Sequence, residues 1–268
     1  MKRFFLFTVN VIKSFFRHNL HIYAGDMTFK LLLSFFPLMV VAIALIGFLG
    51  LDDELLTGFA SGIASVLPYE VTEVASAFAS EVLNEATAAG TTAILSFSAA
   101  IALYNASSGF ASVLMGINNC YGQKDTRSFF KRRVLGILLA LMFIGIVALV
   151  MAFMVLGSGI WRFLLALLAI FAIIALIYKI GNCKKVGFIT VLPGTAVAAT
   201  AWVVLSFLFN VFVKNFADFA VLYGSLGSVF VMIVWLNFIT MALLAGAELN
   251  GQLYHIFADK IKETRKLA

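Results

Sequence analysis

The chain has 268 residues, of which 63% are hydrophobic and 12% are charged, with a formal net charge of +6. Soluble domains average roughly 45–50% apolar and about 25% charged residues, so this composition excludes a water-soluble globule. Because one helical crossing of the hydrocarbon core takes about 20 residues, the length suits one polytopic membrane domain with six crossings.

The N-terminal stretch, residues 1–20, has two different helical faces. Asn10, Lys13, Ser14 and Arg17 share one face, and aromatic and aliphatic side chains cover the remainder. This pattern predicts an amphipathic helix in the cytosolic membrane interface. The alternative is an ordinary cytosolic end that leads into the first span.

The first predicted span covers residues 27–50, which are almost wholly apolar apart from Lys30 at the start and Pro37 inside. The next segment, residues 51–90, carries seven Asp and Glu residues and no Lys or Arg. Beyond Pro68, apolar residues recur every three or four positions opposite the acidic ones. This spacing indicates an amphipathic segment outside the cytoplasm rather than a span.

Five further apolar runs are long enough to be spans. Basic residues gather in the loops at 118–133 and 179–185 and again in the C-terminal tail. These predicted spans cover residues 91–117, 134–156, 160–178, 186–213 and 222–249, and the cytosolic tail covers 251–268.

The placement of the basic residues predicts the orientation. With six crossings, 17 of the 19 Lys and Arg residues fall on the side of the two termini, and Arg162 and Lys214 fall on the other. Basic loops remain in the cytosol. The predicted fold class is therefore all-α: a polytopic membrane protein with six transmembrane helices plus interfacial amphipathic helices, and with N- and C-termini cytosolic.

Charged side chains near the span ends are the first candidates for function, because a charge inside a bilayer is costly. Lys30 lies four residues after Asp26, and Glu248 ends the sixth span at the same cytosolic level. We expect Lys30 to pair with Glu248 or Asp26 and to tie the first and last spans together. The alternative is that Lys30 extends to the lipid headgroups and Glu248 meets water.

Polar residues inside the spans are the second set of candidates. An amide or hydroxyl in hydrocarbon needs a partner or a wet cavity, so such side chains are suited to a substrate path. Hydrogen bonding and close packing between helices is the alternative, and it is the preferred interpretation of any single Asn. The cavity or gate candidates are Lys30, Ser34, Asn105, Tyr223, Ser225, Asn237 and Glu248.

The sequence contains no recognisable catalytic or cofactor motif. The three His residues lack metal-ligand spacing, and neither a phosphate-binding glycine loop nor an RNA-binding aromatic motif occurs. We therefore expect no enzymatic activity, no cofactor, no metal and no nucleic-acid partner. The positive-inside pattern already explains the basic loop.

Several motifs together resemble the YihY/BrkB family of bacterial inner-membrane proteins. They cover nearly the whole chain: Leu-Ser-Phe-Phe-Pro at 33–37, the basic loop at 127–133, Leu-Pro-Gly at 192–194, Tyr-Gly-Ser-Leu-Gly at 223–227, Trp235, and Gly-Ala-Glu-Leu-Asn at 246–250. The resemblance implies six helical spans, both ends in the cytosol, and a place in the bacterial cytoplasmic membrane. Members have carried a ribonuclease label, and no catalytic residues are transferred from it.

We expect a transporter or flippase-like protein for a lipid or another amphipathic substrate. Its partners would be membrane lipids and an anionic or lipid-linked substrate. Pro37 and Pro193 interrupt two predicted spans, and transporters place substrates at discontinuous helices. Two alternatives stay open: the ribonuclease of the family label, and a non-transporting scaffold or envelope-integrity protein.

Overall fold

The computed structural model describes residues 2–49, 76, 91–156, 161–184, 186–215 and 225–267. All regular secondary structure in these ranges is helical, in agreement with the predicted all-α class. The helices are α1 (Lys2–Arg17), α2 (Leu20–Leu49), α5 (Thr91–Cys120), α6 (Phe129–Leu156), α7 (Trp161–Gly181), α8 (Phe188–Asn215) and α10 (Ser225–Leu267). The acidic segment predicted at 51–90 lies outside the described residues, except for residue 76.

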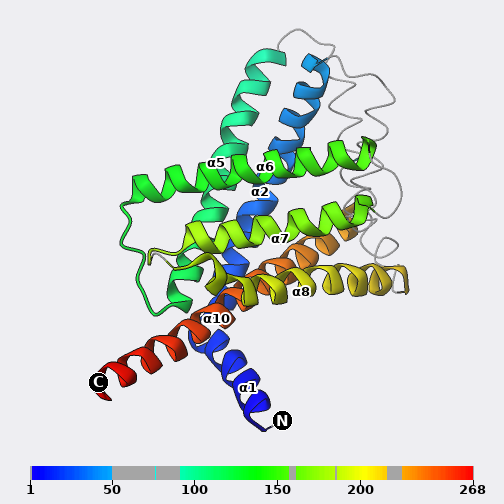
Figure 1. Ribbon diagram of the computed structural model, residues 1–268. Coiled ribbons are helices and arrows are strands. Elements are labelled where there is room, and N and C mark those ends of the chain that lie inside the picture. The colour runs from blue at the N-terminus through cyan, green and yellow to red at the C-terminus, as the bar shows by residue number, and fades with distance from the viewer. Residues whose placement is uncertain are drawn as a thin grey trace.

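The two ends of the chain extend from the same side of the helical body (Figure 1). Helix α1 occupies the range predicted for the interfacial helix and ends at a turn in which Asn19 has a φ of 54°. This left-handed conformation is one that Asn tolerates better than most residues. Helix α2 then begins at Leu20, seven residues before the predicted first span.

The helices do not form one parallel bundle. In Figure 1, α6, α7 and α8 run across the view, α2 and α5 cross them steeply, and α10 lies obliquely. Helix α2 packs most extensively against α5, and α10 packs against both α8 and α2. Because α5 also contacts α6, it joins the steep pair to the transverse helices.

Helix α10 is longer than the predicted sixth span. It continues without a break through the predicted tail and ends at Leu267. The tail contains several Lys, Leu and Ala residues, which favour helix, and it contains no proline. The apolar run therefore marks only the part of this helix suited to the membrane.

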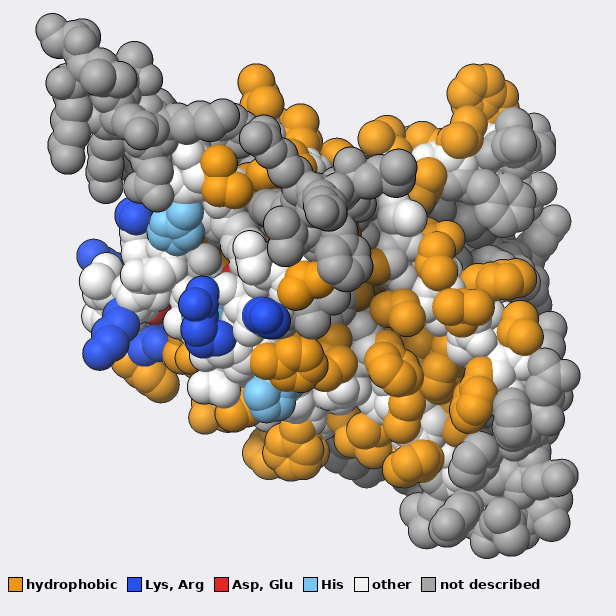
Figure 2. Space-filling model, turned by 90° about the horizontal axis from the view of Figure 1, so that it is seen from below, with side chains coloured by type: hydrophobic (Ala, Val, Ile, Leu, Met, Phe, Trp, Pro, Cys, Tyr) orange, Lys and Arg blue, Asp and Glu red, His pale blue; other side chains and the backbone are white. Residues whose placement is uncertain are grey.

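Two helical stretches among the described residues are long and apolar enough to cross a membrane, Phe188–Phe212 and Val229–Ile256. Large apolar side chains also lie on the outside of the fold: Phe207 is 67% exposed and Leu168 is 62% exposed. Figure 2 shows such side chains over much of one face, with Lys and Arg gathered at one end of it. Surfaces of this kind are normal where lipid replaces water as the solvent. The six-span topology and the cytosolic termini stay predictions.

Glycine permits the closest helix contacts. A Cβ added at Gly136 of α6 would overlap the carbonyl oxygen of Ser107 on α5, and one added at Gly246 of α10 would overlap the carbonyl oxygen of Gly194 on α8. Small residues at such crossings let two backbones approach each other. The first contact holds α6 against α5, and the candidate site lies beside these two helices.

Candidate binding site

A charged group joins α2 to α5. Lys30 Nζ donates to Asp26 Oδ2 at 2.5 Å and to Ser112 Oγ at 2.7 Å, and the Ser112 hydroxyl donates to the same Asp26 oxygen. Burial opposes ionisation of Asp26, but the hydrogen bonds from Lys30 and Ser112 outweigh it and lower the pKa of this carboxyl. Asp26 is one of the two partners predicted for Lys30, and its carboxylate balances the positive charge of Lys30 at neutral pH.

Hydroxyl and amide groups join α2 to α10. The hydroxyl oxygens of Thr28 and Thr240 lie 3.0 Å apart, and both hydroxyls lie within hydrogen-bonding distance of Ala24 O. Asn237 Nδ2 donates to the Thr28 hydroxyl at 3.4 Å. Asn237 thus makes an interhelical hydrogen bond, the contact preferred for a single Asn.

Glu248 has a different partner from the predicted one. Its Oε2 lies 2.9 Å from Nδ1 of His18, which is in the turn between α1 and α2, and its Oε1 accepts a hydrogen bond from Gln252. The Glu248 side chain is fully buried. Its pairing with Lys30 is therefore wrong, and so is the alternative in which it meets water. The connection between the N-terminal helices and α10 at this level runs through His18.

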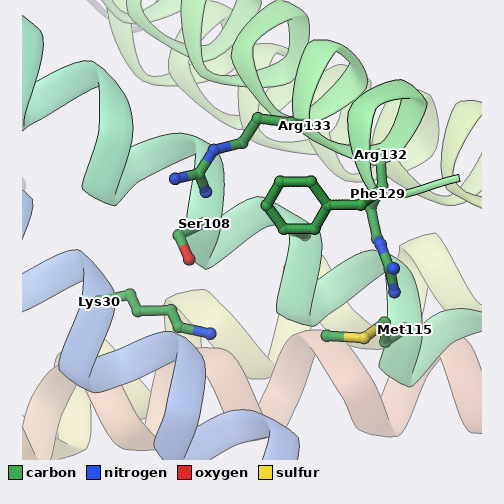
Figure 3. A pocket seen from close by; sticks show the side chains of 7 residues that line it. Lys30, Ser108, Met115, Phe129, Arg132 and Arg133 are labelled. Atoms are coloured by element: carbon green, nitrogen blue, oxygen red, sulfur yellow. The ribbon is translucent and has the colours of Figure 1, made fainter.

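A pocket of about 280 Å³ lies between α2, α5 and α6. Its lining residues are Lys30, Ser108, Ala111, Met115, Phe129, Arg132 and Arg133. Figure 3 shows the Lys30 amino group and the two guanidinium groups around the ring of Phe129. The lining therefore combines cationic and apolar side chains, which are the two kinds of surface that an amphipathic ligand requires.

The two arginines of the pocket have no anionic partner among the residues that the structure describes. Neither Arg132 nor Arg133 forms an ion pair within the part of the chain that the structure describes. The guanidinium carbon of Arg133 lies 3.7 Å from the ring centroid of Tyr104, a cation–π contact that fixes one face of the group. Its Nη2 is buried and has no hydrogen-bond acceptor among the described residues. A buried guanidinium N–H without an acceptor is unfavourable, so this arrangement suits an incoming anion.

Other basic residues at this end of the fold serve the backbone. Arg127 donates to the carbonyl oxygens of Gly181 and Ile180, at 3.0 and 3.1 Å, and so satisfies carbonyls at the C-terminal end of α7. Lys179 donates to the carbonyl oxygen of Val186. The basic loop is therefore divided between helix capping and the pocket.

Two of the family-like motifs meet each other. Asn250 Oδ1 accepts a hydrogen bond from Gly194 N at 2.7 Å, and its Nδ2 donates to Val191 O at 2.9 Å. These backbone groups flank Pro193, which lies inside α8 and cannot donate to the helix. Together with the close approach of Gly246 to Gly194, these hydrogen bonds explain much of the motifs at 192–194 and 246–250 as packing between α8 and α10.

The other gate candidates whose side chains the structure describes do not line the pocket. Ser34 is buried and donates to Leu31 O of its own helix at 2.8 Å. Asn105 is half-buried on α5. Ser225 begins α10, and its side chain, like the whole of Tyr223, lies outside the described residues. Of the five candidates whose side chains the structure describes, Lys30 alone is part of the pocket lining.

The candidates chosen from the sequence did not include His18, Ser112, Arg132 or Arg133. The arginines stand at the start of an apolar run, where the positive-inside pattern gives a sufficient reason for them. Ser108 and Ser112 are four residues apart and thus share a helix face, which was an available sign of a polar contact. No sequence pattern distinguishes an arginine that caps α7 from one that lines a pocket.

These features define a helical membrane protein with an amphipathic pocket near a basic end. The chain belongs to the family described as Virulence factor BrkB, whose model matches residues 11–266. The family expected from the motifs is thereby confirmed. The chain is also 24% identical over 263 residues to the putative ribonuclease-like protein YfkH of Bacillus subtilis (strain 168), covering 90% of this chain and 93% of that protein. No solved structure matches the chain.

Proposed function

We propose that this BrkB family membrane protein is a transporter or flippase-like protein for a lipid or another amphipathic substrate. The observation that carries the proposal is the pocket between α2, α5 and α6, whose lining combines three cationic side chains with Phe129, Met115 and Ala111. A soluble anion would need only the cationic side chains for binding, and a purely apolar ligand would need only the apolar ones. A molecule with a charged head and an apolar body uses both.

The polar contacts of α2 support the same proposal. Asp26, Thr28 and Lys30 place three polar side chains within little more than one turn, and they contact α5 on one side and α10 on the other. Such contacts can exchange between neighbouring helices at modest cost, because measured hydrogen bonds between membrane helices average about 0.6 kcal/mol. We propose Lys30 as a substrate contact and Asn237, through Thr28, as part of the gate.

A flipping assay in proteoliposomes tests the proposal. The purified full-length chain is reconstituted with a trace of headgroup-labelled phosphatidylglycerol, and a membrane-impermeant quencher reports the outer leaflet. Without flipping, the quencher reaches only the labelled lipid of the outer leaflet, which is about half of the total. If the protein flips lipid, label from the inner leaflet also becomes accessible and more than half of the fluorescence is quenched. Quenching that stops at the same level as in protein-free vesicles would overturn the proposal and favour the scaffold alternative.

We also propose that the chain crosses the bacterial cytoplasmic membrane six times, with both termini in the cytosol. Cys183 provides a test, because it lies in the short segment between α7 and α8 and is half-buried, whereas Cys120 is buried. Burial, together with the bond from its thiol to Asp125 Oδ1, raises the pKa of Cys183. Labelling is therefore best done at about pH 8.5, nearer to the usual thiol pKa.

A membrane-impermeant maleimide is expected to label Cys183 in inverted membrane vesicles and not in intact spheroplasts. The Cys183→Ser variant controls for reaction elsewhere in the chain. Labelling in spheroplasts at the rate seen in inverted vesicles would contradict the proposed orientation.

The ribonuclease in the name of the Bacillus relative gives a competing function. We propose that this chain is not a nuclease and that its arginines serve substrate binding. If purified protein degraded RNA, and if Arg132→Ala abolished that activity while the fold was retained, the nuclease would replace the transporter as the best description.

A further inference from the structure

The pocket has an uneven charge distribution that specifies the kind of ligand head. Lys30 is already balanced by Asp26, at 2.5 Å, and hydrogen-bonded to Ser112. Arg132 and Arg133 have no carboxylate partner within the described residues. The pocket therefore carries about two positive charges without a counter-charge from those residues.

The geometry of Arg133 points to a missing acceptor. One face of its guanidinium is occupied by the Tyr104 ring, which leaves the in-plane N–H groups as the donors that remain. Its buried Nη2 has no acceptor among the residues that the structure describes. Guanidinium groups recognise phosphate through paired, parallel hydrogen bonds, and they are less strongly hydrated than ammonium groups. Arg132 and Arg133 both lie near the start of α6 and line the same pocket, so each can donate to a phosphate group bound there.

The apolar part of the lining favours an amphiphile over a free ion. Phe129 is 75% exposed, and in Figure 3 its ring lies between the two guanidinium groups, with the Met115 thioether near Arg132. A volume of about 280 Å³ is enough for a headgroup and its glycerol but not for acyl chains. The chains would then remain outside the pocket, along the exposed apolar side chains of the helices.

We propose that this pocket binds the phosphate group of an anionic amphiphile, with Arg132 and Arg133 donating to the phosphate oxygens and Phe129 and Met115 contacting the adjoining apolar part. Lys30 closes the opposite side of the pocket and remains tied to Asp26. This inference rests on the proposed function, because it names the substrate class of the same pocket. It also requires the inner-face location predicted for Arg132 and Arg133, where anionic headgroups lie.

The test is equilibrium binding to the full-length chain in zwitterionic nanodiscs, which does not depend on transport. The probe is fluorescent phosphatidylglycerol, with fluorescent phosphatidylcholine as the neutral comparison, and inorganic phosphate and glycerol 3-phosphate as soluble competitors. The Arg132→Ala/Arg133→Ala variant should bind phosphatidylglycerol about 30-fold or more weakly than the wild type, because hydrogen bonds to a charged group are lost. The Arg132→Lys/Arg133→Lys variant should have an affinity between those of the wild type and the double alanine variant. Its positive charges are kept, but the paired N–H donors of the guanidinium group are lost.

Lys131→Ala is the matched control. It removes one positive charge from the same turn of α6, but Lys131 is exposed and does not line the pocket. We expect its affinity for phosphatidylglycerol to stay within about threefold of the wild type, the change expected from surface charge alone. Phe129→Ala should weaken binding of the lipid and leave competition by soluble phosphate unchanged. Thermal unfolding of each variant checks that the fold is retained.

The outcomes separate the inference from the proposed function. If Lys131→Ala lost as much affinity for phosphatidylglycerol as either single arginine variant, the inference would be overturned, since surface charge would then explain the binding. If inorganic phosphate competed as strongly as the lipid itself, the inference of an amphiphilic ligand would be overturned. The pocket would then be a site for soluble phosphate. Selective binding without flipping would contradict only the transporter, and flipping with unchanged binding in the arginine variants would contradict only this pocket.

Discussion

Two charged clusters at the basic end of the fold differ in how fully their groups are paired. In the closed cluster, His18 and Gln252 both contact the carboxylate of Glu248, which is completely buried. In the open cluster, Asp26 and Lys30 pair with each other, and their side chains are 41% and 25% exposed. The pocket arginines beside the open cluster have no acidic partner in the described part of the chain.

The difference indicates what each cluster does. A fully buried carboxylate whose two oxygens both have partners holds helices together and is not accessible to a ligand. Cations that border a pocket and lack counter-charges are poorly satisfied without a ligand. Substitutions in the closed region should therefore mainly change stability, whereas substitutions at the open cluster and pocket should mainly change binding.

The largest loss of stability is expected from Gly246→Ala, next to the closed cluster. The added methyl group would overlap Gly194 O and the Tyr178 hydroxyl, and overpacking of this kind costs about 3 kcal/mol. The free energy of unfolding in detergent micelles, measured with denaturant, gives the change. Gly25→Ala on α2 is the control, because an added Cβ there meets nothing within 4 Å. Equal losses in the two variants would contradict the close contact of α8 with α10.

Asn250→Leu should cost about 2 kcal/mol, because two buried hydrogen bonds to the α8 backbone are lost together. The same unfolding measurement applies. Asn119→Leu is a comparison on the other side of the closed cluster, where a single hydrogen bond to His18 O is lost, and it should cost less. A harmless Asn250→Leu would show that α8 does not depend on this side chain.

His18→Leu should cost about 2 kcal/mol, since it removes a hydrogen-bonding partner of a fully buried carboxylate. The double variant His18→Leu/Glu248→Leu should recover most of that loss, because replacing both partners of a buried pair by apolar groups is often nearly neutral. His21→Leu, at an exposed position, should leave the unfolding free energy unchanged. Failure of the double variant to recover stability would mean that the pair contributes little.

Asp26→Asn in the open cluster should have the smallest effect, less than about 1 kcal/mol at neutral pH, because the pair is partly exposed. The pKa of Asp26 is lowered in the folded chain, so its contribution is present above the usual pKa and is lost as the pH falls through the folded value. The difference in stability between wild type and Asp26→Asn should therefore shrink below about pH 4. If the difference in unfolding free energy between wild type and Asp26→Asn grew on acidification, the stabilising effect assigned to the Asp26 carboxylate would be wrong.

The sequence predicted most of the helical frame but not the pairing within it. Apolar runs located helices because they extend over many residues, and the helix over 2–17 followed from its two faces. Lys30 had two carboxylates within plausible reach, and the choice between Asp26 and Glu248 depends on helix rotation, which no local pattern fixes. His18 was overlooked because it lies outside the apolar runs, in a turn whose position becomes clear only once α1 and α2 are packed. The family-like motifs were recognised from the sequence, but their contact through Asn250 and Gly194 was not, since it joins positions 56 residues apart.

That contact also has a consequence for biogenesis. If the helices enter the membrane in the order of their synthesis, the Pro193 turn of α8 reaches lipid before Asn250 leaves the ribosome. The hydrogen bond from Gly194 N to Asn250 then forms only at the final insertion event. Ribosome stalling or truncation ahead of Asn250 would thus leave α8 without both of its hydrogen bonds to α10, and we expect membrane quality-control proteases to act on such incomplete chains.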